Sequence, residues 1–318
     1  MNNPTGMLIN PSKQASETRT TIPHPGLVAI ALAAIVFFNV LASLYWVAQN
    51  TVLIGNDASG YLGTTLEYAQ RFTDLSPATL FQAFTYPEYR TPGLFMAVQP
   101  FYWLFGVDMD SAQLVNIVAL AGLVVAVYAL GAYAAGPGVG LMSALLVGLL
   151  PMIMAMARLF YTELPLTLLV VLALLTLAKS AGFQQRGWSL AWGVSLGIGL
   201  LVKWALPLYV LLPTLWVIWQ SGLLQEQLAS LRNLRVHWRA LGLATLAGLG
   251  LTFLWCWPNR AELPRFLLGN WLTVAWFILF TLWLYALQLP RSRLSNWWAG
   301  ILTAAVLASP WYLPYIDF

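Results

Sequence analysis

Long apolar runs constrain this chain more than any other feature. The first, Leu27 to Ala48, is followed by further runs almost to the end of the sequence. Many approach or exceed the roughly 20 apolar residues that an α-helix needs to cross a bilayer. Only 8% of the residues are charged, against roughly 25% in ordinary soluble domains. The sequence therefore predicts an all-α, polytopic bundle of transmembrane helices.

The same pattern predicts about nine helices and the segments around them. We expect the helices at about 27–48, 111–134, 138–157, 163–179, 188–202, 204–219, 240–257, 269–288 and 297–313. The run from Trp188 to Trp219 is too long for one ordinary span and carries Lys203 at its middle, so two short helices should meet at a turn there.

Residues 1–26 are polar and without periodicity, and we expect a disordered cytoplasmic tail. The run after them is too long for a cleaved signal peptide and should remain as an anchor. The transmembrane domain then covers residues 27–318, with a long outer loop at 50–110 that carries short surface helices. Residues 220–239 are expected to form a cytoplasmic interfacial helix with a basic face, or a plain linker.

Charge placement predicts the orientation, because Lys and Arg favour cytoplasmic loops. With the N-terminus in the cytoplasm, nine of the fifteen basic residues face inward. Nine of the eleven acids then face the outside, and only Glu17 and Glu226 remain inside. We therefore expect a plasma-membrane or inner-membrane protein whose chemistry lies on its outer face. The basic excess marks inner loops, so it does not indicate nucleic-acid binding.

The numbers of cysteine and histidine residues exclude an intrachain disulfide and give no support for a zinc or haem site. Cys256 is the only cysteine, so no intrachain disulfide can form. His24 and His237 are the only histidines and lie far apart in the sequence, and no His/Cys cluster offers a zinc or haem site.

Two acids are candidate catalytic residues. Asp57 begins a potential surface helix just after the first span, where Asn56 or Asp57 could be a simple N-cap, or Asp57 could act as a general base for a lipid-borne substrate. Glu163 follows Thr162 at the start of another helix, where Thr162 could be the N-cap and the Glu163 carboxylate could favour the helix dipole. Alternatively, Glu163 forms an ion pair with Arg158 or belongs to a functional site, because an unpaired charge at that depth in the membrane is costly.

Two cations are candidate phosphate ligands. Arg90 precedes Pro92 and Gly93, where the chain re-enters an apolar run, and it could bind a phosphate bidentately or extend to lipid headgroups. Lys203 allows the same two interpretations, and its anionic partner could be a phosphate or a carboxylate such as Glu163. These groups are what sugar transfer from a polyprenyl phosphate requires: a base for the acceptor and cations for the leaving phosphate.

Four motifs together resemble one family. They are Gly55-Asn56-Asp57-Ala58-Ser59-Gly60-Tyr61, Tyr89-Arg90-Thr91-Pro92-Gly93-Leu94-Phe95, Arg158-Leu159-Phe160-Tyr161-Thr162-Glu163-Leu164-Pro165 and Gly197-Ile198-Gly199-Leu200-Leu201-Val202-Lys203-Trp204. In this order they are similar to the GT-C superfamily of integral membrane glycosyltransferases, in the branch of protein O-mannosyltransferases and lipid A aminoarabinose transferases. The resemblance covers roughly residues 27–215.

The resemblance implies roles for these residues. Asp57 resembles the acceptor-activating base, Glu163 a second acidic residue, and Arg90 the donor-phosphate contact, with Lys203 as a supporting cation. Tyr61, Tyr89 and Arg158 accompany them as supporting residues. The expected partners are a polyprenyl-phosphate sugar donor and membrane lipids. No cofactor is implied, because no second acid stands next to Asp57, although a divalent metal is left open.

The resemblance is incomplete at the C-terminus, where family members usually continue with further helices and often a soluble outer domain. The chain stops at Phe318, so we expect a fragment, a partial product or a minimal member. The predicted function is transfer of a sugar to a lipid, glycan or protein acceptor at the outer face. The alternatives are a truncated or non-catalytic membrane protein of the same fold, and a transporter or flippase.

Overall fold

The computed structural model describes residues 24–50, 56–72, 74, 76–84, 89–232, 237–257 and 271–314, and over these residues it is helical without a strand. In chain order the helices are α2 (Pro25–Gln49), α3 (Asn56–Arg71), α4 (Pro77–Phe84), α5 (Gly93–Phe105), α6 (Met109–Ala135), α7 (Pro137–Leu149), α8 (Pro151–Ala157), α9 (Glu163–Lys179), α10 (Arg186–Val202), α11 (Leu206–Gln220), α12 (Leu223–Arg232), α13 (Trp238–Cys256), α15 (Trp271–Gln288) and α16 (Arg293–Tyr312). The predicted all-α class is confirmed. The predicted tail at 1–26 lies almost wholly outside the described residues.

Three of the helix boundaries predicted from the sequence can be compared directly with the structure. Helix α9 has the predicted bounds, and the run around Lys203 is divided between α10 and α11, as expected. The helix predicted at 138–157 is instead α7 and α8, which meet at a bend of 64°. Pro151 explains the bend, because proline lacks an N–H and pushes the residue before it into an extended conformation. Leu150 has that conformation, with φ −63° and ψ 122°.

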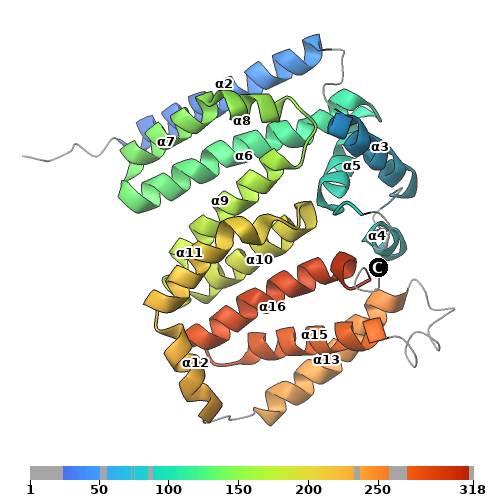
Figure 1. Ribbon diagram of the computed structural model, residues 1–318, viewed down its shortest axis with the longest axis vertical. Helices are drawn as coiled ribbons and strands as arrows, with labels where there is room; N and C mark the ends of the chain where they lie inside the picture. The colour runs from blue at the N-terminus through green and yellow to red at the C-terminus, as the bar shows by residue number, and fades with distance from the viewer. Residues whose placement is uncertain are drawn as a thin grey trace, which may run out of the picture.

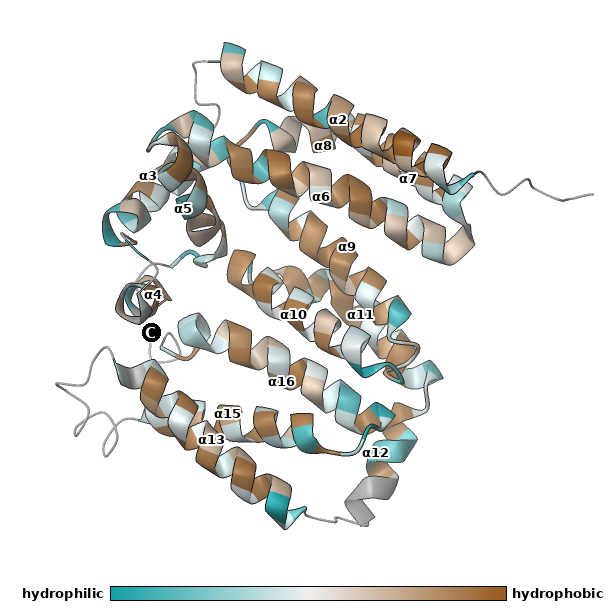
Figure 2. Cartoon of the chain, turned by 180° about the vertical axis from the view of Figure 1, so that it is seen from behind, coloured by the Kyte–Doolittle hydropathy of each residue, from teal (hydrophilic) through white to brown (hydrophobic). Residues whose placement is uncertain are grey.

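The helices lie side by side, and the segments that connect them gather at two ends (Figure 1). Helices α3, α4 and α5 gather at one end, on the right of Figure 1, together with the C-terminal end of α16. The opposite end carries α12 and the turns that follow α6, α9 and α15. Hydrophobic residues dominate the middle of the helices, and hydrophilic residues concentrate towards both ends (Figure 2). We call these the α3–α5 end and the α12 end.

The apolar helices identify an integral membrane protein. Within the described residues, α2, α6, α13 and α15 are each long and apolar enough to cross a membrane, and the bent pair α7–α8 adds a fifth candidate. Helices α5, α10 and α11 are apolar but shorter. The predicted number of nine spans remains a prediction.

Small residues allow α10 to pack closely on α16. A Cβ on Gly193 would lie 2.1 Å from the Gly300 carbonyl oxygen, and one on Gly300 would lie 2.6 Å from the Ser189 carbonyl oxygen. Helices in a lipid environment associate largely through such close backbone packing, because lipid tails are as apolar as the side chains. This contact fixes α10, whose last residue precedes Lys203.

Candidate functional site

A polar cavity of about 190 Å³ lies at the α3–α5 end. It is formed where α3, α5, the start of α9 and the turn between α10 and α11 meet. The side chains that line it are Asp57, Tyr61, Tyr89, Arg90, Thr91, Phe95, Thr162, Val202, Lys203 and Trp204. The structure thus brings together Asp57, Arg90 and Lys203 from segments far apart in the sequence.

Asp57 lies in the first turn of α3 and is exposed at the cavity. Helix α3 begins at Asn56, directly after residues that lie outside the described part of the chain, so the alternative in which Asn56 or Asp57 is an N-cap stays a prediction. Two other acids expected on the outer side serve local structure instead. Asp108 caps α6 by accepting a hydrogen bond from the Ser111 N–H at 2.6 Å. Asp74 accepts hydrogen bonds from Ser76 and Thr79, which lower its pKa below the ordinary value.

Arg90 is held among aromatic rings at the cavity. Its guanidinium lies 4.4 Å from the Tyr89 ring centre and 5.3 Å from that of Tyr61, within cation–π range. Its Nη1 also donates to the Thr64 hydroxyl at 3.0 Å. The guanidinium can approach α3 because residue 60 is glycine: a Cβ there would lie 2.8 Å from Arg90 Nη2.

Lys203 occupies the turn that ends α10, in an extended conformation with φ −160° and ψ 130°. The segment before α5 is docked against this turn. The buried Thr91 hydroxyl donates to the Val202 carbonyl oxygen at 2.7 Å. A Cβ on Gly93 would lie 2.6 Å from the Leu201 carbonyl oxygen, so only glycine allows the two backbones to approach this closely. This docking brings the turn that carries Lys203 to the same cavity as Arg90.

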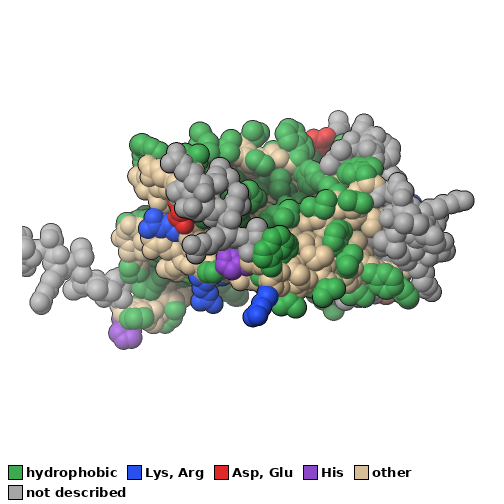
Figure 3. Space-filling view, turned by 90° about the horizontal axis from the view of Figure 1, so that it is seen from below, with side chains coloured by type: hydrophobic (Ala, Val, Ile, Leu, Met, Phe, Trp, Pro, Cys, Tyr) green, Lys and Arg blue, Asp and Glu red, His purple; other side chains and the backbone are tan. Residues whose placement is uncertain are grey.

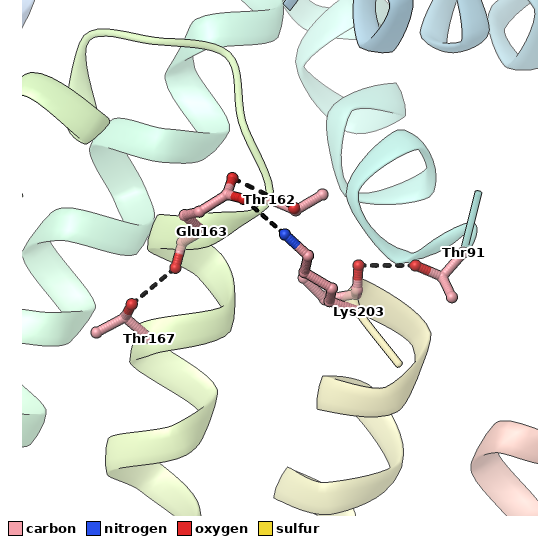
Figure 4. A network of polar contacts seen from close by, with 6 residues as sticks. Thr91, Thr162, Glu163, Thr167 and Lys203 are labelled. Atoms are coloured by element: carbon pink, nitrogen blue, oxygen red, sulfur yellow. Dashed lines mark hydrogen bonds and ion pairs between the residues drawn. The ribbon is translucent and has the colours of Figure 1, made fainter. Parts of the chain in front are cut away.

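Glu163 pairs with Lys203. The Lys203 ammonium lies 2.6 Å from Glu163 Oε1, and the Thr162 hydroxyl donates to Oε2 at 3.4 Å (Figure 4). The two charged side chains keep 42% and 31% of their surface exposed, Glu163 being the more exposed. Thr162 stands at the N-cap, as predicted, but its side chain makes no capping hydrogen bond. Glu163 is therefore next to the cavity, behind Lys203.

Two amides on α6 fix the loop that precedes Glu163. Gln113 Nε2 donates to the Ala157 carbonyl oxygen at 2.8 Å, and Asn116 Nδ2 donates to that of Leu159. Both amides are buried. In the same loop, Tyr161 packs edge-on against Tyr61, with ring centres 5.9 Å apart. Polar side chains buried in helix α6 thus hold the backbone that presents Thr162 and Glu163.

Arg158 does not line the cavity and does not pair with Glu163. Its guanidinium lies 5.9 Å from the ring centre of Trp46, in the last turns of α2. Of the residues singled out from sequence, it is the one that the structure separates from the others. Thr64, Thr91 and Gly60 are neighbours of the cations that sequence reasoning did not single out. Thr91 and Gly60 stand inside the quoted motifs, but their partners lie too far along the chain to be seen there.

The part of the chain that the structure describes contains no group of three or more His, Cys, Asp or Glu side chains arranged to hold a metal ion.

The bond between Thr91 and α10 generates a stability prediction. Thr91→Val keeps the shape of the side chain but leaves the buried Val202 carbonyl oxygen without its donor, which costs about 1–3 kcal/mol. We expect a lower unfolding midpoint in detergent for Thr91→Val, followed by tryptophan fluorescence. Thr91→Ser keeps the hydroxyl and should remain closer to the wild type. Equal midpoints for the wild type and Thr91→Val would show that this bond does not hold the segment.

Comparison with known proteins gives one match. Residues 89–236, just under half of the chain, match the family model described as dolichyl-phosphate-mannose-protein mannosyltransferase. The matched region contains Arg90, Glu163 and Lys203, and Asp57 precedes it. No significant match was found among curated proteins or among solved structures. The family match confirms the resemblance to the GT-C superfamily and indicates a membrane glycosyltransferase that uses a lipid-linked sugar donor.

Proposed function

We propose that this protein transfers a sugar from a polyprenyl-phosphate donor to a lipid, glycan or protein acceptor, at the outer face of the membrane. The observation that carries this proposal is the shared cavity of Asp57, Arg90 and Lys203. It combines one exposed carboxylate with two cations at one end of a bundle of apolar helices. Such a set can activate an acceptor and stabilise a leaving phosphate in the same place.

The donor phosphate binds between Arg90 and Lys203 in this proposal. A guanidinium presents a planar fork that matches two phosphate oxygens, while an ammonium acts as a compact charge with three donors. Tyr61 and Tyr89 hold the Arg90 guanidinium by their ring faces. Both rings thereby keep its donors oriented before the substrate arrives. Trp204 and Tyr89, 68% and 75% exposed, lie at the rim, where aromatic rings suit a membrane interface.

Asp57 is the general base. Its carboxylate takes the proton from the acceptor hydroxyl or amine as that oxygen or nitrogen forms a bond to the anomeric carbon. The bond between the anomeric carbon and the phosphate oxygen breaks, and the electron pair leaves with the polyprenyl phosphate. Arg90 and Lys203 neutralise the negative charge that develops on this phosphate. Attack opposite to the leaving group inverts the configuration at the anomeric carbon.

Glu163 acts through Lys203 as a positioning residue. Its carboxylate fixes the ammonium at 2.6 Å, and the loop behind it is anchored by Gln113 and Asn116. A lysine side chain has many rotamers, so this contact reduces the entropy lost when the phosphate binds. The Glu163 carboxylate also compensates the Lys203 charge when no donor is present.

The apolar tail of the donor requires a separate path, because the cavity is small. An almost wholly apolar groove of about 350 Å³ lies between α10, α11 and α16, and Leu200, Leu206 and Pro207 line it. These residues flank the turn that carries Lys203 in the sequence. A donor with its phosphate at Lys203 could therefore place its first isoprene units in this groove.

The outer-face assignment rests on charge. The acids of the α3–α5 end and the basic residues of the α12 end agree with a cytoplasmic α12 end under the positive-inside rule. The N-terminus would then be cytoplasmic as well, since α2 begins at that end (Figure 1).

Loss of the base tests the catalytic proposal. Asp57→Asn removes the proton acceptor but keeps the size of the side chain, so we expect transfer from a labelled polyprenyl-phosphate sugar to fall by about 100-fold or more. Donor binding should persist. Asp74→Asn is the matched control, because it changes a carboxylate at the same end that only caps local structure. Unchanged transfer by Asp57→Asn would remove Asp57 from the mechanism.

Gly60 offers a second test that leaves every charge in place. Gly60→Ala places a Cβ 2.8 Å from Arg90 Nη2 and must displace the guanidinium. We expect the KM for the donor to rise about tenfold, the equivalent of about 1.4 kcal/mol. Gly63→Ala lies on the same helix with nothing within 4 Å of the new Cβ, and its kinetics should match the wild type. If the two alanine variants behave alike, Arg90 does not need this position.

A further inference from the structure

A second polar cavity, of about 310 Å³, lies at the α12 end, away from the candidate active site. Gly182, Gln184, Gln220, Ser221 and Arg293 contribute to its lining. The Ala178 and Glu163 positions are about 22 Å apart along α9, at a rise of about 1.5 Å per residue. The two cavities therefore stand at opposite ends of the same helix and cannot share one headgroup.

This cavity continues into an apolar groove of about 670 Å³ between α9 and α11. Leu177, Ala178 and Val217 line both spaces, so the polar and the apolar parts are contiguous. Trp216 and Trp219, with ring centres 5.1 Å apart, also line the groove. Indole rings favour the boundary between lipid tails and headgroups. A ligand that fills both spaces must have a polar head and an apolar tail.

The turn that forms one side of the cavity is held in an unusual conformation. Ala181, Gly182 and Phe183 have positive φ angles of 52°, 66° and 66°. This region is unfavourable for residues with a Cβ, and such strain often accompanies a functional site. Asn296 on α16 holds the turn by donating to the carbonyl oxygens of Phe183 at 2.9 Å and Gln184 at 3.2 Å.

Arg293 gives the cavity its charge. Its Nη1 donates to the Ser221 carbonyl oxygen at 2.8 Å, which holds the guanidinium against the end of α11. A guanidinium carries five N–H donors, so donors remain for a ligand. Lys179, Arg186 and Arg291 belong to the same end, and Arg291 is close enough to Arg186 for their charges to repel. Seen from below, the visible Lys and Arg side chains lie over the left half of the molecule, towards the α12 end (Figure 3).

We propose that this bipartite space binds a phospholipid with an anionic headgroup. The headgroup phosphate lies in the polar cavity against Arg293, and an acyl chain follows the groove between α9 and α11. The excess of cations at this end favours an anionic over a zwitterionic headgroup, since each nearby basic residue attracts anionic lipid. The apolar groove favours a lipid over a free phosphate, which would fill the polar cavity alone. The proposal does not depend on the sugar-transfer reaction.

Native mass spectrometry of the purified full chain tests the site. The protein is extracted from nanodiscs that contain equal amounts of phosphatidylglycerol and phosphatidylcholine, and the lipids that remain bound are counted. We expect phosphatidylglycerol to be retained, and retained about tenfold less by Arg293→Gln. Ala178→Phe fills the junction between cavity and groove without changing any charge, and it should lose the same lipid. Arg239→Gln is the matched control, because Arg239 is an exposed cation at the same end and outside the lining.

Four results would overturn the proposal. The wild type could retain both lipids equally, Arg293→Gln could bind as Arg239→Gln does, or Ala178→Phe could keep phosphatidylglycerol. Soluble glycerol phosphate provides the last arm: if it displaces the lipid at equal concentration, the headgroup alone is recognised and the groove has no part. Unfolding midpoints of all variants in one detergent distinguish loss of the site from loss of the fold.

Discussion

The close approach of α5 to the end of α10 is the contact on which the candidate site depends. Gly93 lets the backbone before α5 meet the last turn of α10, and Thr91 closes the contact with a hydrogen bond to Val202. Without it, Arg90 and Lys203 would belong to two separate surface segments. With it, two cations that lie far apart in the sequence face one cavity. Helix α10 is itself fixed by its packing on α16.

Polar contacts of this kind have particular weight in a membrane protein. Backbone groups that are buried away from water must find their hydrogen-bond partners within the protein, because an unpaired buried carbonyl group is costly. Gln113 and Asn116 meet this requirement for the loop before α9, and Asn296 meets it for the turn after α9. The same bonds that satisfy these carbonyl groups also hold a segment of a proposed site at each end of α9. In this proposal, the contacts that stabilise the fold also position the two sites.

The sequence predicted where the apolar helices begin and end better than it predicted the contacts between residues that are far apart in the chain. Apolar length placed α9 at its observed bounds, and the cost of a charge in the middle of a span placed a turn at Lys203. Pro151 lies inside the helix predicted at 138–157, but the bend that it causes between α7 and α8 was not predicted, because the continuous apolar composition suggested a single span. The ion pair between Lys203 and Glu163 was one of the alternatives that the sequence offered, and the structure contains it. The bond between Thr91 and Val202 could not be derived, because the two residues are 111 positions apart and nothing in a single sequence links them. Proximity in sequence suggested Arg158 as one partner of Glu163, whereas folding placed Arg158 beside Trp46.

The central claim is that Arg90 and Lys203 receive one lipid phosphate next to Asp57. An experimental structure of the full chain in nanodiscs with an added polyprenyl phosphate tests this most directly. The account predicts phosphate oxygens at hydrogen-bond distance, about 3 Å, from both the guanidinium and the ammonium, with the isoprene chain leaving between α10, α11 and α16. A phosphate bound elsewhere on the protein, or one that contacts neither cation, would contradict it.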